Sequence, residues 1–192
     1  QLVTKLIWTG QHEPRVSDEE VLTMVGMGLR SGDFEPHEAQ IIQNVLALET
    51  RTAGAVMTPR PVVFSFEAHA TVQDAASHDE LSEFSRIPVY DDDPDDLVGI
   101  VHSRDILKAA AADRFDVKIE ALMRPIDFVV ETALLDGLLR RFLERHQHMV
   151  AVVDEFGGLA GIVTLEDVLE ELIGREIVDE FDQVTDLRAF AH

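Results

Sequence analysis

Hydrophobic residues recur along this chain at two spacings, one typical of helices and one typical of strands. Near the N-terminus, apolar residues follow each other at helical spacing from Val21 to Leu29. They come after a Ser17–Glu20 pair that has the form of a capping box. Pro36 favours the first turn of a second helix. The pattern therefore predicts two short helices ahead of the main body of the chain.

From residue 54 onward the chain repeats itself once. Met57-Thr58-Pro59 is echoed by Met123-Arg124-Pro125, and Gly99–Asp105 is echoed by Gly161–Asp167. Each copy reads as strand, helix, strand, turn, strand and helix. The expected strands lie at residues 62–66, 86–90 and 97–102 in the first copy and at 128–130, 149–153 and 160–164 in the second.

Two copies of one mixed unit predict an α+β fold (mixed α/β) of two pseudo-symmetric repeats packed sheet to sheet, preceded by the two short helices. Two copies are too few for a solenoid, so each is expected to cover the apolar face of the other. The expected division is a linker at 1–16, a helical lead-in at 17–53, a first repeat at 54–116, a second repeat at 117–181 and a tail at 182–192.

Charge narrows the possible partners of the chain. Its 192 residues include 37 acidic and 16 basic side chains, a net charge of −21. Such a surface repels nucleic acid and anionic lipid. A nucleotide ligand would need a magnesium counter-ion and a local positive site, whereas the excess acid as a whole serves solubility. The absence of cysteine excludes disulfides and thiol chemistry. No stretch is apolar enough to span a bilayer.

The step from strand to helix in the second copy carries the clearest candidate chemistry. Thr164 stands where the strand ends, and Asp167 lies one helical turn further on. A helix N-terminus presents free N–H groups to an anion, and a carboxylate there can accept the two hydroxyls of a ribose. The alternative interpretation is that Thr164 and Asp167 form a plain capping box.

The motifs together resemble CBS repeats, and their particular residues resemble those of the CorC/CNNM family of magnesium transporters. The resemblance rests on Val56–Arg60, Ser85–Tyr90 and Gly161–Gly174, and it extends over about residues 17–181. It implies the cytosolic tandem CBS (Bateman) module of a membrane protein, at the cytoplasmic face of the cell membrane. It also implies a homodimer, a membrane-spanning domain of the same protein as partner, ATP and magnesium as ligands, and no enzymatic activity.

The resemblance also suggests site residues. Thr164 and Asp167, with Glu166 beside them, match the positions that hold ribose. The stretch Phe84, Ser85, Arg86, Ile87 and Pro88 matches the segment beside adenine and the phosphates, and Thr58 matches a threonine near the base. On physical grounds, Ile87 and Pro88 offer apolar surface, Phe84 can stack on a base, and Arg86 can bind phosphate.

The first copy departs from this pattern. His102 stands where the second copy has Thr164, and Arg124 replaces the threonine of Met-Thr-Pro. A bulky imidazole at a ribose position hinders nucleotide binding. We therefore expect one occupied site in each chain, built on Asp167, with the Asp105 site empty and Asp105 serving as a helix-start residue.

Other candidate chemistry is weak. The acidic run 91–96 lacks the central glycine and terminal glutamate of a calcium loop, which favours a solvated hairpin loop. His146 and His148 lie at strand spacing without a third ligand nearby in sequence. No P-loop, zinc-protease motif or nucleophile elbow occurs. The leading hypothesis is a nucleotide-sensing regulatory module. The alternatives are a structural dimerisation scaffold with a vestigial site and, on family names alone, a hemolysin-type activity.

Overall fold

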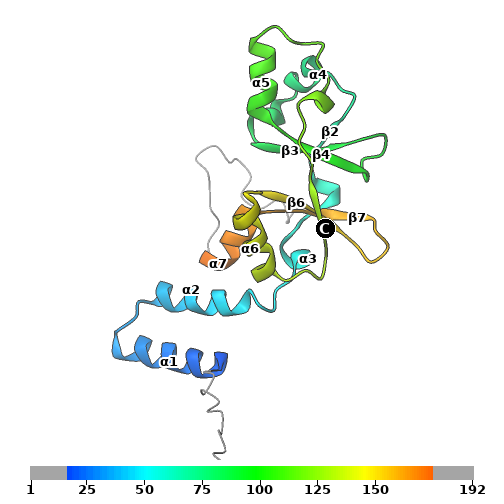
Figure 1. Cartoon of the computed structure of the whole chain (residues 1–192). Helices are drawn as coiled ribbons and strands as arrows, with labels where there is room; N and C mark the ends of the chain where they lie inside the picture. Colours follow the sequence, from blue (N-terminus) through cyan, green and yellow to red (C-terminus); the bar gives the residue numbers. More distant parts are fainter. Residues whose placement is uncertain (1–16, 175–192) are drawn as a thin grey trace, which may run out of the picture.

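The structure, a computed structural model, describes residues 17–174, which form two β-sheets that face each other with helices on their outer sides (Figure 1). The linker expected at 1–16, the end of the second repeat at 175–181 and the tail at 182–192 lie outside the described residues. The mixed fold of two repeats packed sheet to sheet confirms the expected class. Within the described residues, no helix combines the length and apolar character needed to cross a membrane.

The two lead-in helices form as the sequence predicts. Helix α1 (Asp18–Ser31) begins with a capping box, in which the Ser17 N–H donates to the Glu20 carboxylate over 3.0 Å. It ends at Gly32, whose φ of 83° suits glycine. Helix α2 (Pro36–Ala47) packs against α1 and against α7 (Leu165–Ile173), where the Asn44 amide donates to the Leu172 carbonyl. The lead-in is thereby attached to the second repeat.

The first repeat contains a three-stranded sheet in the order β2-β3-β4. Its elements are β2 (Phe66–Glu67), α4 (Val72–Ala76), η2 (Asp79–Ser82), β3 (Arg86–Tyr90), β4 (Leu97–His102) and α5 (Ser103–Ala111). The predictions for β3 and β4 are confirmed, but the strand predicted at 62–66 is wrong for most of its length. Residues Arg60–Val62 form a 3₁₀ turn, η1, because Pro61 has no N–H to give to a ladder.

The second repeat contains a four-stranded sheet in the order β1-β7-β6-β5. Its elements are η3 (Ile119–Ala121), β5 (Asp127–Val130), α6 (Leu135–Arg145), β6 (Met149–Val153), β7 (Leu159–Thr164) and α7 (Leu165–Ile173). The three predicted strands are confirmed to within a residue. Gly174, with a φ of 72°, ends α7 as expected of a C-cap.

The repeats also exchange short segments, which the sequence did not predict. Helix α3 (Ala53–Val56) and strand β1 (Thr58–Pro59) precede the first sheet in sequence, yet β1 pairs antiparallel with β7. The matching segment of the second copy pairs with the sheet of the first repeat, because Arg124 forms an antiparallel bridge with Ile100 on β4. Each repeat thus completes the sheet of the other, and the two copies form one unit.

Three apolar clusters hold this arrangement together. One lies between the first sheet and its helices, and another lies between the second sheet and its helices. The third lies between the two sheets and consists of Leu97, Ile126, Met149, Ala151 and Ile162. Because side chains alternate along a strand, each central strand contributes to an outer cluster and to the inter-sheet layer.

Each of the two exchanged segments lies against a glycine of the strand that it pairs with. A Cβ added to Gly161 would lie 2.3 Å from the Thr58 carbonyl oxygen, and one added to Gly99 would lie 2.6 Å from the Arg124 carbonyl oxygen. These obstacles are backbone atoms, which cannot rotate away. The glycine that opens each Gly-aliphatic-aliphatic step is therefore required by close backbone approach.

We expect Gly161→Ala to lower the free energy of unfolding by about 1–3 kcal/mol, because β1 must move away from β7. Gly137 in α6 is the matched control, since nothing lies within 4 Å of a Cβ added there. Gly137→Ala should stabilise the protein by about 0.5–1 kcal/mol through helix propensity. Urea denaturation of both variants measures the difference, and equal stabilities would contradict the steric argument.

Candidate functional site: a basic cleft between the repeats

A cavity of about 750 Å³ opens between the two repeats. Matching segments of the two copies line it, since Ser85 and Arg86 lie where the chain enters β3 and residues 146–149 lie where it enters β6. His102–Arg104 and Arg124 complete much of the wall. The volume is in the range of small-molecule sites, and three arginines converge on it in a chain that has only 16 basic residues.

Strand alternation decides which residues of β3 face the cleft. Ile87 is fully buried in the cluster beneath α4 and α5. Arg86 and Pro88 therefore point to the opposite, inter-sheet side, and Arg86 lines the cavity while Pro88 is buried. The expectation that the Ile87 side chain offers surface to a base is wrong, because its place in the pleat directs it into the core.

Phe84 and Ser85 precede β3 and differ in their surroundings. The ring of Phe84 stacks on Phe64 with 5.9 Å between ring centroids, and Phe84 packs against the first core cluster. Ser85 is exposed and lines the cleft. Of the five residues expected in this stretch, Ser85 and Arg86 are thus the two that the structure places on the cavity wall.

Thr58 and Thr164 lie on the same side of the second sheet. Thr58 pairs with Ile162 across the β1–β7 ladder, and Thr164 follows two residues later on β7. Ile162 belongs to the inter-sheet layer, so all three side chains share the face that looks towards the first repeat. Thr58 and Thr164, which are far apart in sequence, thus share one face of the second sheet.

Thr164 and Asp167 form a closed capping box at the start of α7. The Thr164 N–H and hydroxyl both donate to one oxygen of the Asp167 carboxylate, over 2.7 and 2.8 Å, and the Asp167 N–H donates back to the hydroxyl over 3.2 Å. Thr71 and Asp74 make the same three bonds at the start of α4. The bonds in both boxes are those of the plain capping alternative considered for this pair.

The first turn of α7 lies at the edge of the cleft, because its residue Glu166 contacts two residues of the cavity wall. Its carboxylate lies 3.5 Å from the Arg86 guanidinium and 3.9 Å from a ring nitrogen of His148. Arg86 and His148 line the cavity from the two repeats. Of the residues expected in the site outside the 84–88 stretch, Glu166 therefore contacts Arg86, whereas Thr58, Thr164 and Asp167 are not among the residues that line the cavity.

The first-copy half of the cleft is built differently. His102 precedes α5 and its side chain makes no capping bond. The Arg124 guanidinium lies 3.3 Å from the Asp105 carboxylate, the counterpart of Asp167. Burial lowers the pKa of His102, and the nearby Arg124, Arg104 and Arg86 lower that pKa further, whereas Asp105 opposes them. This half thus has a neutral imidazole and an arginine where the other half has threonines.

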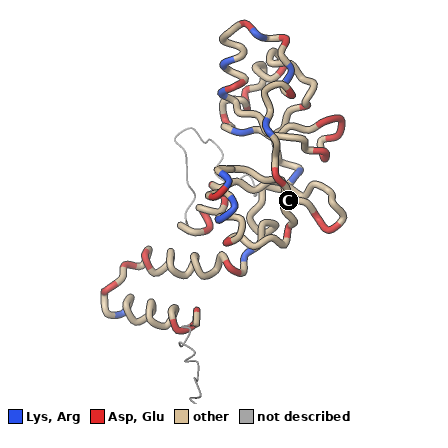
Figure 2. Tube along the Cα trace, in the orientation of Figure 1, with Lys and Arg blue, Asp and Glu red and all other residues tan. Residues whose placement is uncertain are grey.

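Sequence reasoning missed several residues of the cleft. Gln147 and His148 line it, although the histidine pair 146 and 148 was considered only as a metal site. The strand pairing shows the correspondence, because Arg86 pairs with His102 as Met149 pairs with Thr164, so His148 and Met149 occupy the positions of Ser85 and Arg86. The acidic run 91–96 lies away from this wall, in the turn between β3 and β4 (Figure 2).

Comparisons with known proteins agree with this architecture. Residues 53–112 and 117–174 each match the CBS domain family. The CBS domain of a bacterial CNNM/CorC family Mg²⁺ transporter superposes with a TM-score of 0.80 at 36% identity, covering 86% of this chain and all of that one. A structure of such a domain in complex with ATP superposes with a TM-score of 0.69 at 36% identity, covering 73% of this chain and 99% of that one.

A longer relative is the UPF0053 protein sll1254 of Synechocystis, which is 34% identical over 200 residues. The match covers 99% of this chain but 58% of the relative, so the chain spans a little over half of that protein. Two tandem CBS domains define a class of regulatory module, which is not an enzyme family. The chain belongs to the CBS domain family, as the tandem CBS module of the CNNM/CorC magnesium transporter type.

The electrostatics of the first-copy half can be tested at His102. Its imidazole should titrate below the ordinary value of 6.5 in the folded protein. Arg124→Gln removes a nearby cation and leaves Asp105 without that partner, and both changes should raise the pKa of His102. NMR titration of the ring protons measures this shift. Arg140→Gln, which removes an exposed partner of Asp136, is the control and should leave the pKa in place. A downward or absent shift in Arg124→Gln would contradict the assignment.

Proposed function

We propose that this chain is the cytosolic regulatory module of a magnesium transporter and binds ATP with magnesium between its CBS repeats. The observation that carries the proposal is the cavity of about 750 Å³ between the repeats, with Arg86 on its wall and the start of α7 at its edge. A structurally similar CNNM/CorC family CBS domain has been solved in complex with ATP, which supports the same ligand class here.

We propose a role for each part of the nucleotide site. Thr58 and Thr164 flank Ile162 on the inter-sheet face, and this apolar and hydroxyl-bearing surface suits a nucleoside. Asp167 would accept hydrogen bonds from the ribose. Arg86 would leave its long 3.5 Å contact with Glu166 for the phosphates, where charge-assisted bonds are stronger.

Magnesium fits this site as part of the ligand. No carboxylate is among the residues that line the cavity within the described chain, whereas magnesium prefers oxygen ligands and retains several waters. Phosphate oxygens and water would therefore hold the ion. Its charge would also offset the repulsion between a polyphosphate and a chain of net charge −21.

Regulation requires a partner and a movement. We propose that the module forms a homodimer, and that ATP favours one dimer arrangement, which is passed to the membrane-spanning domain of the same protein at the cytoplasmic face. Large exposed apolar side chains support a further contact, among them Met24 at 66% and Leu143 at 62% exposure. A ligand shifts such an equilibrium only by its differential affinity for the two arrangements.

Calorimetry with ATP and magnesium should show one site in each chain. Asp167→Ala should abolish this binding, because it removes the proposed ribose acceptor. Asp74→Ala is a closely matched control, since Asp74 and Asp167 make the same three capping bonds with their threonines. Both variants should lose about 0.5–2 kcal/mol of stability, but only Asp167→Ala should lose ATP.

Two results of this experiment would overturn the proposal. Wild-type protein that shows neither heat of binding nor a melting shift with ATP would favour the alternative, a dimerisation scaffold with a vestigial site. Equal loss of ATP binding in Asp74→Ala and Asp167→Ala would show that a general loss of fold, rather than the ribose contact, explains the effect.

The single-site expectation leads to a gain-of-function test. His102→Thr combined with Arg124→Thr would give the first-copy half the two threonines of the second and release Asp105 from its 3.3 Å contact with Arg124. The number of ATP molecules bound per chain should rise from one to two. His102→Thr alone should remain at one, since Arg124 still engages Asp105. Two sites in the wild type would contradict the argument from His102.

A further inference from the structure

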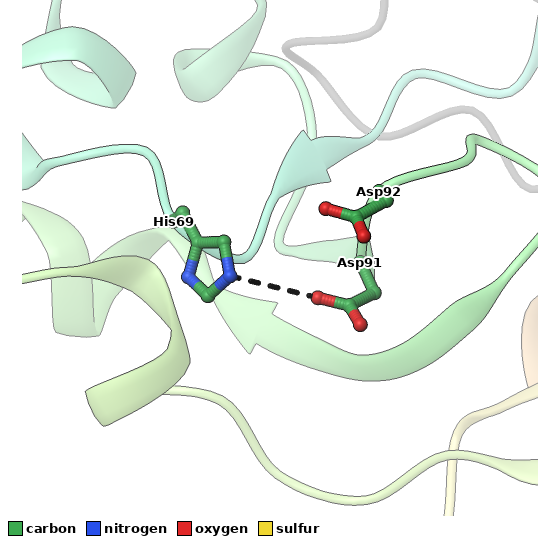
Figure 3. Close-up of side chains that lie close together, drawn as sticks. All are labelled: His69, Asp91 and Asp92. Atoms are coloured by element: carbon green, nitrogen blue, oxygen red, sulfur yellow. Dashed lines mark ion pairs between the residues drawn. The ribbon is translucent and has the colours of Figure 1, made fainter.

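Three side chains of types that can ligate a metal lie close together on the first repeat (Figure 3), and none of them lines the cleft. His69, Asp91 and Asp92 each present one ligand atom, and the three atoms all lie within 4.8 Å of one another. His69 follows β2, and the two aspartates follow β3. The sequence did not predict this group, because His69 lies far from the acidic run 91–96 along the chain.

The backbone that carries these side chains is fixed by hydrogen bonds. The Ala68 N–H donates to the Tyr90 carbonyl over 2.8 Å, which holds the neighbours of His69 and Asp91 side by side. The Glu120 N–H donates to the Ala68 carbonyl over 2.9 Å, which brings η3 to the same place. The ligand set is therefore positioned by the fold rather than by a freely moving loop.

The Glu120 carboxylate lies close enough to His69 to orient its ring without itself being a metal ligand. Its side chain lies 3.5 Å from Nδ1 of His69, while Nε2 of His69 lies 3.7 Å from the Asp91 carboxylate. A histidine that ligates a metal through one nitrogen commonly donates its other N–H to a carboxylate, which fixes the tautomer and the ring orientation. Glu120 can do this for His69 and leave Nε2 directed towards the two aspartates.

The side chains around His69 carry an excess of negative charge, which a bound cation would offset. Asp91, Asp92 and Glu120 bring three carboxylates, and Lys118, 3.8 Å from Glu120, brings one ammonium. With His69 neutral, two negative charges remain in excess. A divalent cation between His69 and the aspartates would neutralise them.

We propose that His69, Asp91 and Asp92 form a binding site for a first-row divalent cation such as Zn²⁺, with Glu120 as the carboxylate that orients His69. An imidazole nitrogen among the ligands favours such an ion over Mg²⁺, which prefers an all-oxygen shell. Ligand atoms around one zinc stand about 3–3.5 Å apart, given bonds of about 2.0–2.2 Å, so small rotations of these side chains close the site. Water completes the coordination. This site is separate from the proposed nucleotide site and independent of it.

The test is a titration of the whole chain with Zn²⁺ in the absence of nucleotide, followed by calorimetry and by the ring signals of His69 in NMR spectra. We expect one saturable site that shifts these signals, and at least a tenfold loss of zinc affinity in His69→Gln and in Asp92→Asn. Asp96→Asn is the matched control, because it removes the same charge from the same exposed turn outside the ligand set. Glu120→Gln should weaken zinc by about 10–100-fold.

Thermal melting separates a lost site from a damaged fold. Zinc should raise the melting temperature of the wild type and of Asp96→Asn but not that of Asp92→Asn, whose melting temperature without metal should not fall. The proposal would be overturned by the absence of saturable zinc binding, by equal affinity in His69→Gln and wild type, or by Mg²⁺ binding at the same site as tightly as Zn²⁺. ATP binding, measured separately, should be the same in all these variants.

Discussion

The apolar layer between the two sheets is the constraint on which the rest of this structure depends. Within residues 17–174, the α-helices that pack on each sheet lie on its outer face, so its inner face would meet water if the repeat stood alone. Leu97 from one sheet and Met149, Ala151 and Ile162 from the other close that gap. Because strand side chains alternate, the same pairing that buries these residues directs Arg86 and Thr164 towards the inter-sheet side. The cleft is therefore a consequence of how the core is built.

The exchange of short strands makes this pairing specific. Strand β1 lies on β7 over Gly161, and the matching Arg124 segment lies on β4 over Gly99. Any side chain at either glycine would meet a backbone carbonyl. The exchange also places Thr58 opposite Ile162 of β7 and Arg124 3.3 Å from Asp105. Because Thr58 and Arg124 are equivalent residues of the two copies, this difference in sequence makes the two half-sites chemically different.

The sequence predicted much of this fold because its signals are local. The Ser17–Glu20 capping box, the short apolar runs in 86–90 and 149–153 and the glycine after α7 each act within a few residues. What it could not predict depends on contacts between distant segments. The strand expected at 62–66 was limited by Pro61, and the direction of Ile87 into the core depended on the register of β3 against β4. The approach of His69 to Asp91 required the parallel pairing of β2 with β3.

The two halves of the cleft differ in the contacts that join the repeats. In the first-copy half, Arg124 already neutralises Asp105, and the neutral His102 stands at the helix start. In the second-copy half, the partner of Arg86 is Glu166, across the boundary between the repeats. Both contacts join segments of the two copies, since Arg124 comes from the second copy and Asp105 from the first. The two half-sites therefore differ in the chemistry of the contact: an aspartate at the start of the helix already holds Arg124, whereas Arg86 is held by the more exposed Glu166. A polyanion would compete more readily for Arg86, and in doing so it would replace a contact between the repeats with contacts to the ligand.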